Sequence, residues 1–260
     1  MSISPDRLER YARHIMLREI GGAGQKRLAG AAVAIIGLGA LGGPAALYLA
    51  AAGVGRLRLI DDDRVSLSNL QRQVLYRTAD VGALKTEIAL SSLEALNPDC
   101  RTEAVCERLT AANAASLLSG FGVVIDGSDT FASRFAANAA CLELGSVFIT
   151  AAVSRWSAQA GVFRAGLTRH APAAERAPCY RCFVPEAPGQ EETCAATGVA
   201  GPLTGIVGAR LALEAVKEIT GAGDTLDGRI WLFDGLSGEE RTLRLSADPA
   251  CLACGTAVRA

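Results

Sequence analysis

The sequence predicts an α/β fold, with a mostly parallel sheet that carries helices on both faces and a β-rich antiparallel part towards the C-terminus. Short apolar runs alternate with helix-like segments up to residue 152, as in a parallel sheet buried on both faces. A glycine-rich turn joins the first apolar run to a helix. Beyond residue 152 the pattern becomes β-rich around one long helix.

Short helices and a βαβ unit open the chain. Residues 5–17 read as a helix with Pro5 near its start, and residues 21–28 as a glycine-punctuated helical turn. The apolar run 32–37 predicts a buried strand, and the helix 41–54 follows it until Gly53 and Gly55. A second strand at 56–61 completes the unit, whose crossover we expect to be right-handed.

The alternation then continues to residue 152. A helix at 85–97 is stopped by Asn97-Pro98. The following elements are expected as strand 101–107, helix 111–120, strand 122–129, helix 131–145 and strand 147–152. Further on, strands are predicted at 157–165, 228–235 and 241–247, with a long helix at 201–220 and a mobile loop at 166–200. We therefore expect one domain, 1–260, in three parts: 1–30, 31–152 and 153–260.

Composition excludes several classes of protein. The chain has 260 residues, is 50% hydrophobic and carries a formal net charge of −1, so it offers no electrostatic footprint for nucleic acid or an anionic membrane. The N-terminus lacks the apolar region of a signal peptide, and no apolar run is long enough to span a bilayer, which predicts a cytoplasmic protein. Eight cysteines in that compartment favour metal or thiol chemistry over disulfides.

The glycine turn predicts a Rossmann-like phosphate site. Gly37, Gly39 and Gly42 form G-x-G-x-x-G between a strand and a helix, where backbone N–H groups and the helix N-terminus attract a phosphate. Asp61 ends the next strand, where an acid hydrogen-bonds a ribose hydroxyl. A turn without a ligand is the alternative, and on this motif alone NAD would be the leading candidate.

The residues after Asp61 favour a triphosphate instead. Asn69, Arg72 and Gln73 follow the acid closely, and Lys85 comes twelve residues after Gln73. A triphosphate needs guanidinium and ammonium partners together with Mg²⁺, whereas a dinucleotide is held largely by backbone amides. Either cation taken alone is as readily a solvated surface charge.

Together these motifs resemble a known family. The stretches RYARHIML, GLGALGG, AGVGRLRLIDDDRVSLSNLQRQ, VGALK and DGSDT resemble, in order and spacing, the sulfur-carrier adenylyltransferases of the MoeB/ThiF/HesA family, relatives of the ubiquitin-activating enzymes. The resemblance extends from about Leu8 to Gly255, and SNLQRQ is its most specific part. The closest pattern is that of molybdopterin-synthase adenylyltransferase.

The resemblance implies a role for each matching residue. Asp61 would bind the ribose, Asp129 would be the Mg²⁺-associated acid that adenylation requires, and Arg13 would reach the ATP of the neighbouring subunit of a homodimer. The implied ATP contacts are Gly37, Gly39, Ala40, Gly42, Asp61, Asp63, Ser68, Asn69, Arg72, Gln73, Lys85, Asp129 and Thr130. The family usually has asparagine where this chain has Thr130, so we expect altered contacts near the adenylate without loss of activity.

The implied reaction suits these residue types. The C-terminal glycine carboxylate of a small ubiquitin-like sulfur carrier ending in Gly-Gly attacks the α-phosphorus of ATP, giving an acyl-adenylate and pyrophosphate. A carboxylate is already a nucleophile, so the site must position and neutralise two anions, a task for Arg13, Arg72, Lys85 and Mg²⁺. The resemblance implies sulfur transfer for molybdenum cofactor biosynthesis, with carriers of thiamine, cysteine or natural-product pathways as alternatives.

Two other classes of function compete. An NAD-dependent oxidoreductase would need an acid/base pair for hydride transfer, and the sequence offers no convincing one. A non-catalytic binding subunit would be expected to lose Arg72, Lys85 or Asp129, and all three are present. The chain ends at Ala260 without a rhodanese extension, so sulfur is expected from a separate sulfurtransferase or cysteine desulfurase.

Four cysteines predict a structural zinc site. Cys179 and Cys182 form one C-x-x-C pair and Cys251 and Cys254 another, and two such pairs make a closed tetrahedral Zn–S₄ centre. The metal would join the C-terminal tail to the loop at 166–200. A redox dithiol or unrelated thiols are the alternatives.

The remaining cysteines and the histidines say less about function. Cys194 matches the position of a cysteine that forms an acyl or disulfide link to the carrier in relatives, and a dispensable or structural thiol is the alternative. Cys100, Cys106 and Cys141 fall within strand or helix patterns and are expected in the core. Neither His14 nor His170 has the surroundings of a metal ligand.

Overall fold

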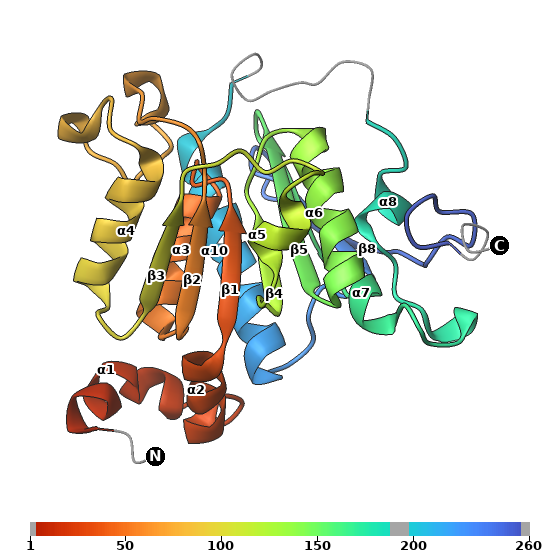
Figure 1. Cartoon of the computed structure of the whole chain (residues 1–260), viewed down its shortest axis with the longest axis horizontal. Coiled ribbons are helices and arrows are strands. Elements are labelled where there is room, and N and C mark those ends of the chain that lie inside the picture. The colour runs from red at the N-terminus through yellow and green to blue at the C-terminus, as the bar shows by residue number, and fades with distance from the viewer. Residues whose placement is uncertain (1–3, 188–197, 256–260) are drawn as a thin grey trace.

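One continuous sheet runs through the molecule. The computed structural model describes residues 4–187 and 198–255, and its eight strands have the order β3-β2-β1-β4-β5-β6-β7-β8. The first five are mutually parallel, and β6, β7 and β8 continue the sheet antiparallel, as the sequence predicts (Figure 1). The strands are β1 Ala32–Ile36, β2 Arg56–Ile60, β3 Arg101–Val105, β4 Val123–Asp126, β5 Val147–Ser154, β6 Ser157–Phe163, β7 Arg229–Asp234 and β8 Glu240–Arg244.

Helices cover both faces of this sheet. The main helices are α1 Pro5–Ile15, α2 Gly21–Gly30, α3 Gly42–Ala52, α4 Lys85–Leu96, α5 Ala114–Leu118, α6 Phe131–Leu144 and α10 Gly201–Thr220. In Figure 1, α10 lies behind the sheet and α5 and α6 lie in front of it. The two apolar cores separate in the same way, with Ile35 and Leu49 in the core under α3 and α10, and Ala34 and Val124 in the core under α5 and α6.

The parallel strands end in register at one edge. Ile36, the last residue of β1, pairs with Ile60 of β2 and with Asp126 of β4. The loops that follow β1, β2 and β4 therefore meet at the carboxyl edge of the sheet, the usual binding edge of open α/β sheets. Helices α1 and α2 lie at the opposite edge (Figure 1).

Helix boundaries follow local signals in the sequence. Helix α1 begins after Ser4, whose hydroxyl accepts from the Arg7 N–H. Helix α3 ends at Gly53, which adopts a left-handed φ of 83°. Helix α4 ends at Leu96, directly before the Asn97-Pro98 pair.

The segment 166–200 is more ordered than the sequence predicts. Its described part contains the short helices α7 Ala165–Thr168 and α8 Tyr180–Phe183 and the 3₁₀ turn Ala173–Glu175. Cys179 and Tyr180 are buried. The expectation of a loop throughout was wrong because polar and proline-rich flanks conceal an aromatic anchor, Tyr180, which packs edge-on against Phe148 and Phe163.

The buried thiols follow the sequence with one exception. Cys100 and Cys141 are buried, as predicted. Cys106 is exposed, so its assignment to the core was wrong. Strand β3 ends at Val105, which leaves Cys106 beyond the last pair of the ladder, Ile60 with Val105.

Among the described residues, no helix combines the length and apolar character that crossing a membrane requires.

Candidate active site

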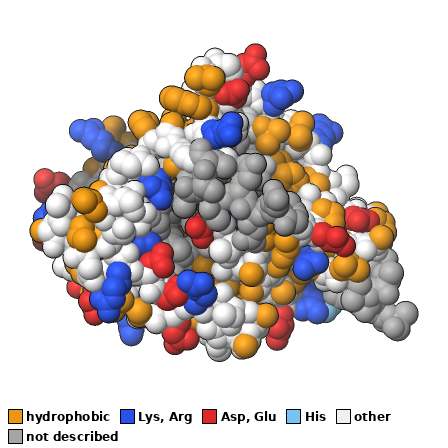
Figure 2. Space-filling view, turned by 90° about the horizontal axis from the view of Figure 1, so that it is seen from above, with side chains coloured by type: hydrophobic (Ala, Val, Ile, Leu, Met, Phe, Trp, Pro, Cys, Tyr) orange, Lys and Arg blue, Asp and Glu red, His pale blue; other side chains and the backbone are white. Residues whose placement is uncertain are grey.

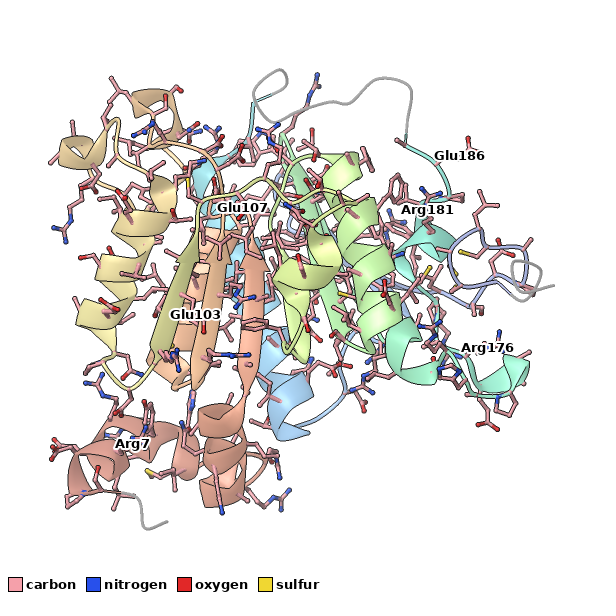
Figure 3. The ribbon with its side chains drawn as sticks, viewed as in Figure 1. Arg7, Glu103, Glu107, Arg176, Arg181 and Glu186 are labelled. Carbon is pink, nitrogen blue, oxygen red and sulfur yellow. The ribbon has the colours of Figure 1, made fainter. Side chains whose placement is uncertain are left out.

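A cavity of about 770 Å³ opens at the carboxyl edge of the sheet. Its walls come from the loops after β1, β2 and β4, from the start of α6, and from β5, β6 and β7. Viewed from this edge, acidic and basic side chains lie side by side around the middle of the molecule (Figure 2). Glu107, which lines the cavity, lies at this edge, and Arg7 of α1 lies at the opposite one (Figure 3).

The glycine turn brings three loop backbones into contact. The Gly37 N–H donates to the Ile60 carbonyl and the Gly127 N–H to the Ile36 carbonyl, each at 2.8 Å. A Cβ on Gly42 would lie 1.8 Å from the Gly37 carbonyl oxygen, so this position requires glycine. The N-terminus of α3 has no side-chain cap, but the Gly43 N–H donates to the Gly39 carbonyl at 3.0 Å and Pro44 has no N–H. The backbone that faces the cavity is therefore that of the turn itself, at Gly39, Ala40 and Leu41.

Asp61 is the buried acid beside this turn. Its carboxylate accepts from the Leu38 N–H at 2.6 Å and from the Asp63 N–H at 2.8 Å. Burial raises the pKa of Asp61, and the positive charge of Lys85 and the two N–H donors oppose that rise. The turn and the following loop are thus fixed to one carboxylate that also lines the cavity.

Two of the basic residues predicted from the sequence, Lys85 and Arg72, line the cavity. Lys85 is 3% exposed, and its Nζ lies 2.8 Å from Asp63 Oδ2. Arg72 donates to the Ser68 carbonyl and to Asn69 Oδ1, both at 3.1 Å. These contacts orient both side chains before any ligand binds, which lowers the entropy cost of binding an anion.

Asp129 follows β4 with an exposed carboxylate. Within residues 4–187 and 198–255 this carboxylate makes no ion pair or hydrogen bond. The next residue, Thr130, is the N-cap of α6 and accepts from the Ser133 N–H at 3.3 Å. The unpaired oxygen ligand and the nearby phosphate-binding turn fit a Mg²⁺–nucleotide pair.

The cavity contains an unpaired acceptor as well. Gln73 is buried against the glycine turn, with its Nε2 3.4 Å from the place a Cβ on Gly39 would take. Its Oε1 has no hydrogen-bond partner among the described residues. A buried orphan acceptor in a ligand-sized cavity is the expected mark of a missing donor, such as a hydroxyl of a bound nucleotide.

The structure brings most of the predicted nucleotide contacts together. The residues that line the cavity are Gly37, Gly39, Ala40, Asp61, Asp63, Asn69, Arg72, Gln73, Lys85, Asp129 and Thr130. Gly42 lies behind the turn, and Ser68 is exposed with its hydroxyl 3.0 Å from that of Ser66, so neither lines the cavity. Arg13 belongs to α1 at the opposite edge of the sheet. Cys194 lies outside the described residues.

Sequence reasoning missed a second group of lining residues. They come from the loops after β2 and β3, the first turn of α6, and the strands β6 to β8, and include Asp62, Arg108, Arg134, Gln159, Phe233 and Arg241. The signal available for Arg134 was its position as the sole charged residue in the first turns of an alanine-rich helix that starts two residues after Asp129. No comparable local signal marks the antiparallel strands.

The four C-x-x-C cysteines form a separate cluster. Their sulfur atoms all lie within 4.8 Å of one another, with Cys179–Cys251 at 3.6 Å and Cys182–Cys254 at 3.5 Å. Tetrahedral Zn–S bonds of about 2.3 Å place sulfurs about 3.8 Å apart, so the spacing fits one metal ion. The Asp248 N–H donates to the sulfur of Cys182, as expected for a thiolate ligand.

The fold and the cavity define an α/β protein with a Rossmann-like sheet and a ligand-sized cavity at its carboxyl edge. The chain matches the ThiF family over residues 11–253 and belongs to it. It is 41% identical over 259 residues to the sulfur carrier protein adenylyltransferase of Thermus thermophilus, covering 98% of this chain and 93% of that protein. It is 42% identical over 246 residues to the sulfur carrier protein ThiS adenylyltransferase of Escherichia coli, covering 95% and 94%.

A solved structure shares the fold. The crystal structure of E. coli MccB with MccA-N7isoASN superposes with a TM-score of 0.81 at 22% identity, covering 95% of this chain and 75% of that one. The expected α/β architecture is thereby confirmed. With the family match, the enzyme class of the chain is that of the adenylyltransferases.

Proposed function

We propose that this protein adenylates the C-terminal glycine carboxylate of a small ubiquitin-like sulfur carrier, using ATP and releasing pyrophosphate. The observation that carries the proposal is the cavity at the carboxyl edge, where the glycine turn, Arg72, Lys85 and the exposed carboxylate of Asp129 converge. An NAD-dependent oxidoreductase would not need both Arg72 and Lys85 beside the glycine turn, because backbone amides largely hold a dinucleotide pyrophosphate. Membership of the ThiF family supports the same reaction.

The residues divide the work of the reaction. The backbone of the glycine turn would bind the phosphates, and Asp61 the ribose. Arg72 and Lys85 would neutralise the triphosphate so that a second anion, the carrier carboxylate, approaches the α-phosphorus in line. Mg²⁺ held by Asp129 would supply further charge neutralisation for the leaving pyrophosphate.

We also propose that the four-cysteine cluster holds a structural zinc ion. Four thiolates leave no open coordination position, so the ion would stabilise the fold and take no part in the chemistry. It would tie the segment at Cys179 and Cys182 to the C-terminal segment at Cys251 and Cys254. We expect elemental analysis of the purified protein to find one zinc ion per chain, and the Cys251→Ser variant to have lost it.

A homodimer would complete the active site. The outer surface of α3 and α10 exposes Tyr48, Ile206 and Leu213 by 60%, 50% and 50%, an apolar face along the strand direction. If two copies pack there about a twofold axis that runs across the strands, α1 of one copy comes beside the carboxyl edge of the other. Arg13 would then reach the cavity of the neighbouring copy. This agrees with its position in α1, at the edge of the sheet opposite the cavity of its own chain.

The carrier we propose first is that of molybdenum cofactor biosynthesis, on the pattern of the sequence motifs. The thiamine carrier is the second candidate, because of the 42% identity to the ThiS adenylyltransferase of E. coli. A separate sulfurtransferase or cysteine desulfurase would supply sulfur. A cytoplasmic location and a covalent role for Cys194 stay predictions from the sequence.

Carrier-dependent exchange of labelled pyrophosphate into ATP tests the function. We expect exchange with at least one purified carrier ending in Gly-Gly and none with the same carrier lacking its last glycine. Asp129→Asn should abolish it, whereas Asp224→Asn, which changes an acid that does not line the cavity, should not. Absence of exchange with every carrier offered would refute the proposal.

A further inference from the structure

Arg134 ties two strand ends together beside the cavity. It lies in the first turn of α6, and its side chain is 8% exposed. One terminal nitrogen, Nη2, donates to the Ser128 carbonyl at 2.9 Å and to the Ala151 carbonyl at 3.1 Å. Ser128 belongs to the loop after β4 and Ala151 to β5, so a single guanidinium group links this loop to the neighbouring strand.

A buried acid neutralises this guanidinium. Asp126 Oδ2 lies 3.5 Å from Arg134 Nε, and the carboxylate also accepts from the hydroxyls of Ser128 at 2.6 Å and Thr150 at 2.7 Å. Burial raises the pKa of Asp126, and the charge of Arg134 and the two hydroxyls oppose that rise. Asp126 therefore compensates most of the charge of Arg134 inside the protein. This suits a residue that positions the backbone better than one that binds a phosphate.

Tyr180 supports Arg134 from the side away from the cavity. The two residues line the same small hollow next to the main cavity. Among the described residues the buried Tyr180 hydroxyl has no hydrogen-bond partner, so Tyr180 supports Arg134 by packing. The Tyr180 ring lies 5.9 Å from the ring of Phe135 and 5.7 Å from that of Phe163. Its N–H donates to Asn138 Oδ1 at 2.9 Å, which fixes it to α6 as well.

Asp129 depends on this support because it has none of its own. Its carboxylate makes no ion pair or hydrogen bond in the described part of the chain, so its position follows from the backbone of the loop and from the charge of Arg134, with which it interacts electrostatically and whose pKa it raises. Thr130 fixes that backbone on one side by capping α6. The Ser128 carbonyl, held by Arg134, fixes it on the other.

We infer that Arg134 is a positioning residue that sets the loop 127–130 so that Asp129 meets the nucleotide-bound Mg²⁺, with Tyr180 holding Arg134 in place. The inference rests on the proposed function for the role of Asp129. Lysine at position 134 would keep the positive charge and pair with Asp126. Its single nitrogen could not pair with Asp126, as Nε of Arg134 does, and at the same time hold the two carbonyls that Arg134 reaches through Nη2.

The test compares Arg134→Lys with a matched control, Arg58→Lys. Arg58 is also a partly buried arginine that donates to a backbone carbonyl, that of Leu117 at 2.9 Å, and pairs with an acid, Glu103, but it does not line the cavity. ATP affinity of the full chain is measured by calorimetry with and without Mg²⁺. We expect Arg134→Lys to reduce the Mg²⁺-dependent gain in affinity about tenfold and to leave Mg²⁺-free binding within about twofold. Arg58→Lys should change neither.

A second measurement is independent of any ligand. Hydrogen exchange of the amides at 127–133 in the free protein should speed up in Arg134→Lys and stay unchanged in Arg58→Lys. The inference would be overturned if Arg134→Lys kept both the wild-type gain in ATP affinity on adding Mg²⁺ and the wild-type rate of amide hydrogen exchange at 127–133. If the wild-type protein binds ATP with a Mg²⁺ gain but shows no carrier-dependent exchange of pyrophosphate, the proposed function fails and the inference stands. If ATP does not bind at all, hydrogen exchange alone decides.

Discussion

At the scale of single residues, Asp61 combines a structural and a binding task. Its carboxylate accepts two backbone N–H groups, from Leu38 and Asp63, and still lines the cavity. We predict that Asp61→Asn lowers ATP affinity about 100-fold, since charged hydrogen bonds contribute about 1.5–3 kcal/mol each. Calorimetric titration measures this directly, and an affinity within threefold of wild type would contradict the assigned role.

The same substitution has a pH signature in stability. Burial raises the pKa of Asp61 in the folded protein above its ordinary value of 3.8, although Lys85 opposes the rise. The folded state therefore holds this proton more tightly than the unfolded state, and the stability that Asp61 contributes falls as pH rises through the folded-state pKa. Urea unfolding should show a smaller loss of stability for Asp61→Asn at about pH 7 than at about pH 3.5, just below the ordinary pKa.

Thiol reactivity distinguishes the exposed from the buried cysteines. Burial raises the pKa of Cys100 to about 11, and Thr102 opposes this only weakly, whereas Cys106 is exposed. At about pH 8 we expect iodoacetamide to modify Cys106 at least 100-fold faster than Cys100, as followed by peptide mass spectrometry. In urea the two rates should converge. Equal rates in the folded protein would contradict the burial of Cys100.

Which site residues the sequence could predict depends on how local their signals are. Asp61, Asn69 and Arg72 lie in one short stretch after a strand, and Asp129 lies in the short loop after another, so motif and topology together place them. The Arg134 side chain, in contrast, is positioned by residues distant in the sequence: the Ala151 carbonyl of β5 and Tyr180. Such contacts leave no periodic pattern in the sequence.

At the scale of elements, the packing of α10 on α3 relies on a close approach at one glycine. A Cβ on Gly208 would lie 2.7 Å from the Leu41 carbonyl oxygen and 2.9 Å from Pro44 Cβ. A Cβ on Gly205, one turn earlier in the same helix, would meet nothing within 4 Å. These two positions therefore separate helix propensity from packing.

We predict opposite effects for alanine at these two positions. Gly208→Ala should lower the free energy of unfolding by about 1–3 kcal/mol, because α10 must move away from α3. Gly205→Ala should leave it unchanged or raise it by up to about 1 kcal/mol, since alanine is the better helix former. Urea unfolding of both variants provides the check, and a Gly208→Ala protein as stable as Gly205→Ala would refute the close packing.

Element boundaries followed the sequence where a local signal sets them. Glycine at the end of α3, proline after α4 and apolar runs in β1 and β4 are each sufficient by themselves. The segment around α8 was missed because its order comes from packing with distant strands and with α6, through Tyr180. The predicted three-part division of the domain is not expressed as a break in the sheet, since β6 pairs directly with β5.

At the scale of the whole molecule, one sheet separates two chemically different ends. The carboxyl edge carries the cavity with its acids and cations, and the other edge carries α1 with Arg13 (Figure 1). A monomer therefore keeps Arg13 away from its own cavity, and the apolar face of α3 and α10 lies between the two ends. This arrangement favours an active site that two copies share.

Mixing two inactive variants tests the shared site. In the proposed dimer, each cavity combines its own Asp129 with the partner subunit's Arg13, so Arg13→Ala and Asp129→Asn should each remove activity from every site. A mixed dimer regains one intact site, because its Arg13→Ala chain keeps Asp129 and its Asp129→Asn chain supplies Arg13. Random exchange of equal amounts makes half of the dimers mixed, and half of their sites intact, so about a quarter of wild-type pyrophosphate exchange should return.

The control for this experiment pairs variants that fail on the same side of the interface. Arg72→Ala and Asp129→Asn both alter residues that line one chain's own cavity. Every site in their mixed dimer keeps one defect, so mixing them should restore nothing. Recovery in the first mixture and none in the second requires Arg13 to act across the interface. No recovery in the first, with mixed dimers demonstrated by native mass spectrometry, would place Arg13 outside the neighbouring site.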